Sequence, residues 1–138
     1  MLARPSPLTV AERQLIAAYV SGLNQCQFCH GAHSAIAADL GVGKTLFAAL
    51  LDDVDGAPVV DKIKPVLRYA RTLALAPSRL TQADADSVFE AGWDEQSLGD
   101  AVAICALFNF CNRIVEGHSI KGNAAYFERL RGFIAKEG

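Results

Sequence analysis

Two cysteines and two histidines lie close together in the first third of the chain, at Cys26, Cys29, His30 and His33. With about 100° between successive helical residues, all four side chains would share one face of a helix. Thiols and imidazoles on one face can bind zinc, attach a haem, or supply a dithiol that cycles between thiol and disulfide. The spacing separates these three uses.

Zinc and haem fit the spacing poorly. A helix places Cys26 and His33 about 10 Å apart along its axis, whereas zinc ligands lie roughly 2.0–2.3 Å from the ion, so one helix cannot close a site with all four donors. A partial zinc site completed from elsewhere in the chain remains an alternative. The stretch from Cys26 to His30 also matches the short attachment pattern of c-type haem. The haem iron would need a second axial ligand, and the only methionine that could supply one is Met1. We expect neither a metal nor a cofactor.

A redox dithiol fits best. Two cysteines separated by two residues at the start of a helix face unpaired backbone amides, an arrangement that lowers a thiol pKa and favours the thiolate. The alternative is that both are inert core thiols, which is the usual state of a lone cysteine. Two cysteines at this spacing, beside two histidines, favour the functional interpretation.

The elements that must position these residues are predicted to be helices. Apolar residues recur with a helical period nearly throughout, and no run alternates as a strand would. We expect an all-α fold, a single-domain bundle of about six to seven helices over residues 1–138. Caps and helix-breaking residues predict helices at residues 9–22, 24–41, 44–53, 61–76, 81–91, 94–117 and 123–135.

Three helix starts have a recognisable cap. Thr9 and Glu12 have the spacing of a capping box, so we assign Glu12 to the cap rather than to chemistry. Asp61 and Thr81 are the predicted caps of the fourth and fifth helices.

Composition limits the classes of partner. The 138 residues are 51% hydrophobic with a mean hydropathy of +0.21 and a net charge of −2. The high hydrophobic fraction excludes a disordered chain. The small net charge gives no electrostatic footprint for nucleic acid or an anionic membrane. The apolar content is also higher than a small monomer can easily bury. We therefore expect a homo-oligomer.

One long stretch, from Gln14 to Ala38, has no charged residue. It is long enough to span a bilayer, but its middle is too polar for hydrocarbon, so we expect it to be buried or to form a site. The N-terminus lacks the apolar core of a secretory signal, and we expect a cytoplasmic protein, in which cysteines are reactive or buried thiols before they are structural disulfides.

The residues from Ala11 to His33 resemble the core motif of the alkylhydroperoxidase AhpD-like, carboxymuconolactone decarboxylase-like superfamily, most closely its peroxidase-related branch. In that motif an acid precedes the first cysteine by twelve positions, the cysteines are three apart, and a histidine follows the second cysteine by four. Cys26, Cys29 and His33 match in type and spacing. The stretch from Ala106 to Gly117 is also similar to that branch, so the resemblance extends over most of the chain.

The resemblance implies a peroxidase that reduces hydroperoxides. Cys29 would be the attacking thiolate, Cys26 would form the disulfide with it, and His33 would move the proton. It also implies a dithiol or lipoyl-type reductant and a homo-oligomer such as a dimer, trimer or hexamer. The departure is Gln14, which stands where the motif has its acid and cannot carry a proton. Because general acid–base catalysis typically contributes about 10²–10⁴-fold, we expect a slower peroxidase or one that recruits another carboxylate.

Two other functions stay open: a carboxymuconolactone decarboxylase-like lyase, whose chemistry has no need of two thiols, and a non-catalytic thiol-redox sensor. Cys105 and Cys111 are about 240° apart around one predicted helix, so we expect buried free thiols there rather than a pair. His118 follows a helix end, where a structural role is expected. The polar residues on the most apolar helix are expected to line a site or to make buried hydrogen bonds: Asn109, Asn112 and Arg113.

Overall fold

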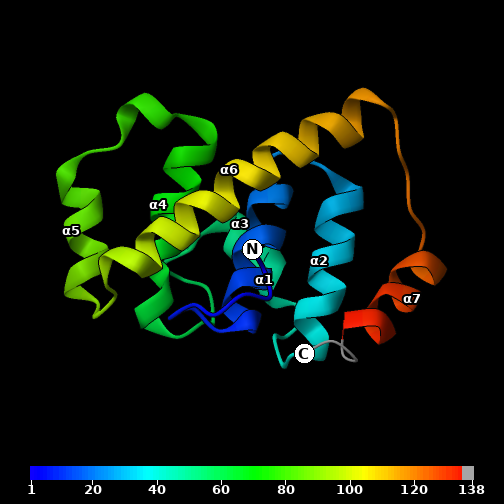
Figure 1. Cartoon of the computed structure of the whole chain (residues 1–138), viewed down its shortest axis with the longest axis horizontal. Coiled ribbons are helices and arrows are strands. Elements are labelled where there is room, and N and C mark those ends of the chain that lie inside the picture. Colours follow the sequence, from blue (N-terminus) through cyan, green and yellow to red (C-terminus); the bar gives the residue numbers. More distant parts are fainter. Residues whose placement is uncertain (135–138) are drawn as a thin grey trace.

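The computed structural model describes residues 1–134. Within this range the chain forms seven α-helices and two short 3-10 helices and has no strand (Figure 1), which confirms the predicted all-α class. The elements are α1 (Val10–Leu23), α2 (Gln27–Asp39), α3 (Leu46–Asp52), η1 (Asp61–Ile63), α4 (Lys64–Leu75), η2 (Pro77–Arg79), α5 (Gln82–Glu90), α6 (Glu95–Gly117) and α7 (Ala124–Ile134).

Helix α1 is the centre of the fold. It packs against α2, α3, α4 and α6, and its buried residues run without a gap from Arg13 to Ser21. A helix that is covered on all sides shows no polar stripe, which explains why this stretch lacks charge after Arg13. The consequence for function is that Gln14, only 1% exposed, faces protein rather than solvent.

Two of the predicted caps are confirmed. The Thr9 hydroxyl accepts from the Glu12 backbone N–H at 3.1 Å, and the Glu12 carboxylate accepts from the Thr9 N–H at 2.8 Å. At the fifth helix, the Thr81 N–H donates to the Asp84 carboxylate at 2.8 Å. Glu12 is therefore occupied at the start of α1, as predicted.

The predicted cap at Asp61 is wrong. Asp61 begins the 3-10 helix η1, and α4 starts at Lys64 with Ile63 in the cap position. The Asp61 carboxylate pairs instead with the Lys64 ammonium at 2.8 Å. Pro65 lies in the first turn of α4, where its missing N–H removes no helical hydrogen bond. The last predicted helix, residues 123–135, is observed as α7, and residue 135 lies outside the described part of the chain.

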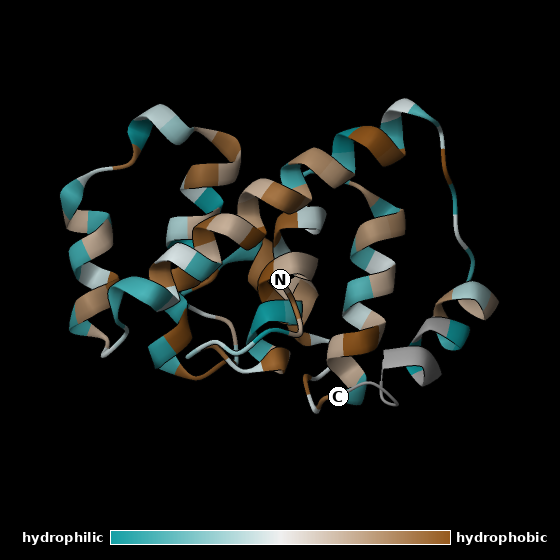
Figure 2. Cartoon of the chain, viewed as in Figure 1, coloured by the Kyte–Doolittle hydropathy of each residue, from teal (hydrophilic) through white to brown (hydrophobic). Residues whose placement is uncertain are grey.

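Helix α6 is long and largely apolar (Figure 2). Its inner face, with Ile104, Cys105 and Phe108, joins the core, while Phe110 is 64% exposed and Ile114 46%. Among the described residues it is the one helix with the length and hydropathy of a membrane span, a property shared by core helices of soluble proteins. Its C-terminal half passes over the junction of α1 and α2, where the cysteines lie.

Helix α7 packs against the outer side of α2 (Figure 1). The Phe28 ring contacts the rings of Tyr126 and Phe127, with centroids 5.4 and 6.1 Å apart. An ion pair between Arg131 and Asp39, 2.5 Å long, joins the two helices farther along. Gly31 permits this approach, because a Cβ there would lie 2.6 Å from the Phe127 ring.

Candidate active site

The chain reverses direction between α1 and α2, and this turn fixes Cys26. Asn24 ends α1, and Gln25 has a φ of 57°, in the left-handed region that few residues other than glycine adopt. Cys26 is then the N-cap of α2, with its N–H donating to the Ser21 carbonyl at 3.0 Å. The prediction that the second helix begins at residue 24 is wrong, because the left-handed residue interrupts the helical backbone.

Cys26 and Cys29 are free thiols in a buried setting. Cys26 has no exposed surface and Cys29 is 6% exposed. Burial, with a smaller contribution from the neighbouring Cys26 thiol, raises the pKa of Cys29 to about 12, and only the Asn112 side chain acts to lower it. The sequence-based expectation of a lowered thiol pKa at this helix start is therefore wrong for Cys29, because loss of hydration outweighs the helix terminus.

His33 lies one turn after Cys29 and hydrogen-bonds to Gln14. Its Nδ1 is 2.7 Å from Gln14 Oε1, and its ring meets the Phe108 ring edge-on with centroids 4.6 Å apart. Because an amide oxygen only accepts, Nδ1 carries the proton and Nε2 keeps a free lone pair. Burial lowers the pKa of His33 to about 4, so the imidazole is neutral at neutral pH.

His30 faces another part of the molecule. Its Nδ1 lies 2.7 Å from the Ala18 carbonyl oxygen and so donates to it, and its ring meets the Phe47 ring edge-on at 5.5 Å. The two histidines were expected on one face of the helix, but they meet different neighbours: His30 packs against α3 and His33 against α6. His30 therefore links α2 to α1 and lies apart from the His33 ring.

The C-terminal half of α6 supplies residues that the sequence left open. Asn112, 2% exposed, lies beside Cys29 and donates to the Ser21 hydroxyl at 3.0 Å. The Asn24 amide donates to both Asn112 and Asn109 at 3.0 Å. Buried amides on an apolar helix were the only signal in the sequence, and that signal does not say which partner they meet.

The remaining cysteines and His118 occupy separate places. Cys105 is fully buried, its thiol lies 3.5 Å from the Ala70 carbonyl oxygen, and burial raises its pKa to about 11. Cys111 is half-buried and close enough to influence Cys29. His118 is the exposed C-cap residue of α6. Both cysteines are free thiols, as expected, but only Cys105 is buried as predicted. Within residues 1–134 no cluster of three His, Cys, Asp or Glu side chains could hold a metal ion.

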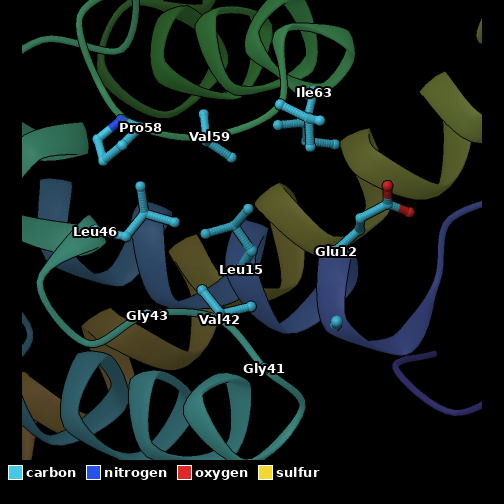
Figure 3. A pocket seen from close by; sticks show the side chains of 11 residues that line it. Glu12, Leu15, Gly41, Val42, Gly43, Leu46, Pro58, Val59 and Ile63 are labelled. Atoms are coloured by element: carbon cyan, nitrogen blue, oxygen red, sulfur yellow. The ribbon is translucent and has the colours of Figure 1, made fainter.

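An apolar groove lies on another side of α1 (Figure 3). It has a volume of about 260 Å³, Leu15, Val42 and Leu46 point into it, and Glu12 stands at its edge. Neither cysteine lines it. The groove is therefore separate from the dithiol.

A model of the carboxymuconolactone decarboxylase family matches residues 1–72, just over half of the chain. The match contains Gln14, both cysteines of the dithiol and His33. The chain belongs to the carboxymuconolactone decarboxylase family. This membership confirms the resemblance that the cysteine motif indicated.

Two solved structures have the same fold as this family member. One is an uncharacterized peroxidase-related protein from Silicibacter sp. TM1040, with 26% identity and a TM-score of 0.84. The other, from Ralstonia eutropha JMP134, is described as an alkylhydroperoxidase AhpD core and an uncharacterized peroxidase-related protein, with 25% identity and the same TM-score. Each match covers 94% of this chain and 68% of the other. A comparison with curated proteins found no match.

Proposed function

We propose that this family member is a thiol-dependent peroxidase of the alkylhydroperoxidase type, with Cys29, Cys26, His33 and Gln14 as its active-site residues. The observation that carries the proposal is the pair of buried, reduced thiols at the start of α2 with a neutral imidazole one turn away. The peroxidase-related descriptions of both structural relatives support it.

The proposed reaction has two steps on the protein. The Cys29 sulfur attacks one peroxide oxygen, the O–O bond breaks, and the products are Cys29 sulfenic acid and an alkoxide that takes a proton to become the alcohol. The Cys26 thiol then displaces water from the sulfenic acid and forms the Cys26–Cys29 disulfide. An external dithiol, which we propose to be a lipoyl-type or other small dithiol, reduces the disulfide by exchange and leaves as its own disulfide.

The site must generate the thiolate at the moment of attack. Because burial raises the pKa of Cys29 far above neutral pH, the resting residue is almost entirely in the thiol form at pH 7. The free lone pair of His33 Nε2 makes the imidazole the proton acceptor, and Gln14 holds the ring in the tautomer that exposes this lone pair. An amide cannot take over the positive charge that develops on the ring, so we propose a slow peroxidase.

The assignment is tested by hydroperoxide consumption with dihydrolipoamide as reductant. Cys29→Ser is expected to reduce turnover to the uncatalysed rate, and Cys26→Ser to stop after a single turnover. Cys105→Ala removes a buried thiol on a different helix, α6, and is the matched control that is expected to retain turnover. Equal turnover in all three variants would contradict the proposal.

Counting the free thiols before and after hydroperoxide is added separates the alternatives. A lyase leaves the thiol count unchanged when hydroperoxide is added, whereas a redox sensor loses two thiols once and recovers slowly. The burial and raised pKa of Cys29 slow its reaction with peroxide in a sensor as much as in an enzyme, so they do not favour either alternative. Continued turnover with reductant distinguishes the peroxidase from both.

A further inference from the structure

A polar pocket of about 250 Å³ lies beside the C-terminal half of α6. It is lined by Asn24, Asn112, Arg113 and Glu116. Neither thiol lines it, but Asn112 belongs both to the pocket wall and to the surroundings of Cys29. The pocket is therefore one side chain away from the proposed attacking sulfur.

The amides of this pocket are fixed in place. Asn24 donates to the side-chain oxygens of Asn109 and Asn112, each at 3.0 Å, and Asn112 donates to the Ser21 hydroxyl. The network ties the end of α1 to α6 across the pocket. A ligand entering here would meet a wall that does not need to rearrange, which lowers the entropic cost of binding.

Arg113 brings a positive charge to the pocket. Its Nη1 donates to the Asn109 backbone oxygen and to Asn109 Oδ1, both at 3.0 Å, so the guanidinium is held while its other nitrogens remain available as donors. Within residues 1–134, no carboxylate lies within ion-pair distance of Arg113. A guanidinium that is positioned but unpaired is suited to a carboxylate, which it binds through two parallel hydrogen bonds.

The Glu116 carboxylate lines the same pocket and would repel an anionic ligand. This carboxylate, three residues after Arg113, is 3.5 Å from the Lys121 ammonium, so its charge is partly balanced from outside. Arg113, by contrast, has only neutral oxygens as partners and keeps its charge for a ligand carboxylate.

We propose that this pocket binds the carboxylate of an organic hydroperoxide and so selects acidic hydroperoxides as substrates. Arg113 holds the carboxylate, and Asn24 and Asn112 orient the chain of the substrate toward Cys29. This proposal rests on the peroxidase function proposed above and adds the class of its substrate.

The test compares a hydroperoxy acid with its methyl ester, which differ only in the charge. With neutral dihydrolipoamide as reductant, the parent is expected to show a kcat/KM at least tenfold higher for the acid. Arg113→Gln is expected to reduce this acid-to-ester ratio about tenfold or more. Arg79→Gln, which removes an exposed arginine on η2, is the control and leaves the ratio unchanged.

Two further results decide the source of the carboxylate. If Arg113→Gln leaves the ratio intact but abolishes a preference for dihydrolipoate over dihydrolipoamide, the pocket serves the reductant and the proposal is wrong. Calorimetry with the product hydroxy acid and the Cys29→Ser variant measures binding without turnover, and equal affinity with and without Arg113→Gln would overturn it. A parent that consumes no hydroperoxide but binds the hydroxy acid through Arg113 would contradict the peroxidase function alone.

Discussion

The hydrogen bond between His33 and Gln14 is the residue-scale feature on which the activity depends most. Gln14 Oε1 accepts from His33 Nδ1 at 2.7 Å, and Gln14 is buried while His33 is half-buried. A carboxylate in this position would keep the same geometry and add a negative charge. That charge would raise the pKa of His33 and make the ring a stronger base for the Cys29 proton.

Gln14→Glu is therefore expected to increase hydroperoxide turnover by at least about tenfold, within the range that general acid–base catalysis provides. Steady-state peroxide consumption at fixed dithiol concentration measures it. Gln14→Leu, of similar size but unable to accept the Nδ1 proton, is the control and should be slower than the parent. A Gln14→Glu variant that folds normally and is no faster would show that residue 14 does not take part in the proton transfer.

The pH dependence of Cys29 follows from its burial. Because the pKa is raised to about 12, the thiolate fraction grows about tenfold with each pH unit through the neutral and mildly alkaline range. Alkylation of Cys29 by iodoacetamide, followed by peptide mass spectrometry, should accelerate from pH 7 to pH 10 without a plateau. A plateau reached between pH 6 and 8 would show that the thiol is already ionised there.

At the scale of elements, the sequence located the helices better than it located their ends. The capping boxes at Thr9 and Thr81 were predictable because both partners lie three residues apart. The start of α2 was not, because nothing in its composition marks Gln25 as left-handed. Asp61 failed as a cap because a 3-10 turn intervenes before α4.

The contact between α2 and α7 depends on the absence of a Cβ atom at Gly31. A Cβ on Gly31 would lie 2.6 Å from the Phe127 ring, so Gly31→Ala must displace that ring or the helix that carries it. We expect a loss of about 1–3 kcal/mol in the free energy of unfolding, as for other overpacked sites, together with faster hydrogen exchange in α7. Denaturant melts and exchange mass spectrometry measure the two effects.

The matched control is Gly99→Ala on α6, where a Cβ would meet no atom within 4 Å. There the gain in helix propensity is expected to stabilise the protein by about 0.5–1 kcal/mol. Equal effects of the two substitutions would show that α7 does not pack on Gly31 in solution.

At the scale of the whole molecule, the all-α class and the dithiol motif were predictable because they depend on local pattern. The position of Asn112 beside the dithiol was not predictable. Asn112 reaches Cys29 only because α6 folds back over the junction of α1 and α2, and one sequence does not reveal which apolar helix covers which turn. The same holds for the separation of His30 from His33, which neighbouring helices decide.

Large exposed side chains support the self-association that the composition predicts. Val60 is 73% exposed, Phe110 64% and Leu75 50%. We propose a homo-oligomer and expect sedimentation equilibrium at micromolar concentration to give a mass of two or more chains. A monomer throughout this range would contradict the proposal.

The most direct test of the account is a titration of the reduced protein with hydroperoxide, followed by thiol counting and disulfide mapping. One equivalent is expected to remove two of the four thiols and to join Cys26 to Cys29, and the dithiol reductant restores both. In Cys26→Ser the reaction should stop at a Cys29 sulfenic acid that dimedone traps. Four unchanged thiols, or a disulfide that omits Cys29, would contradict the account.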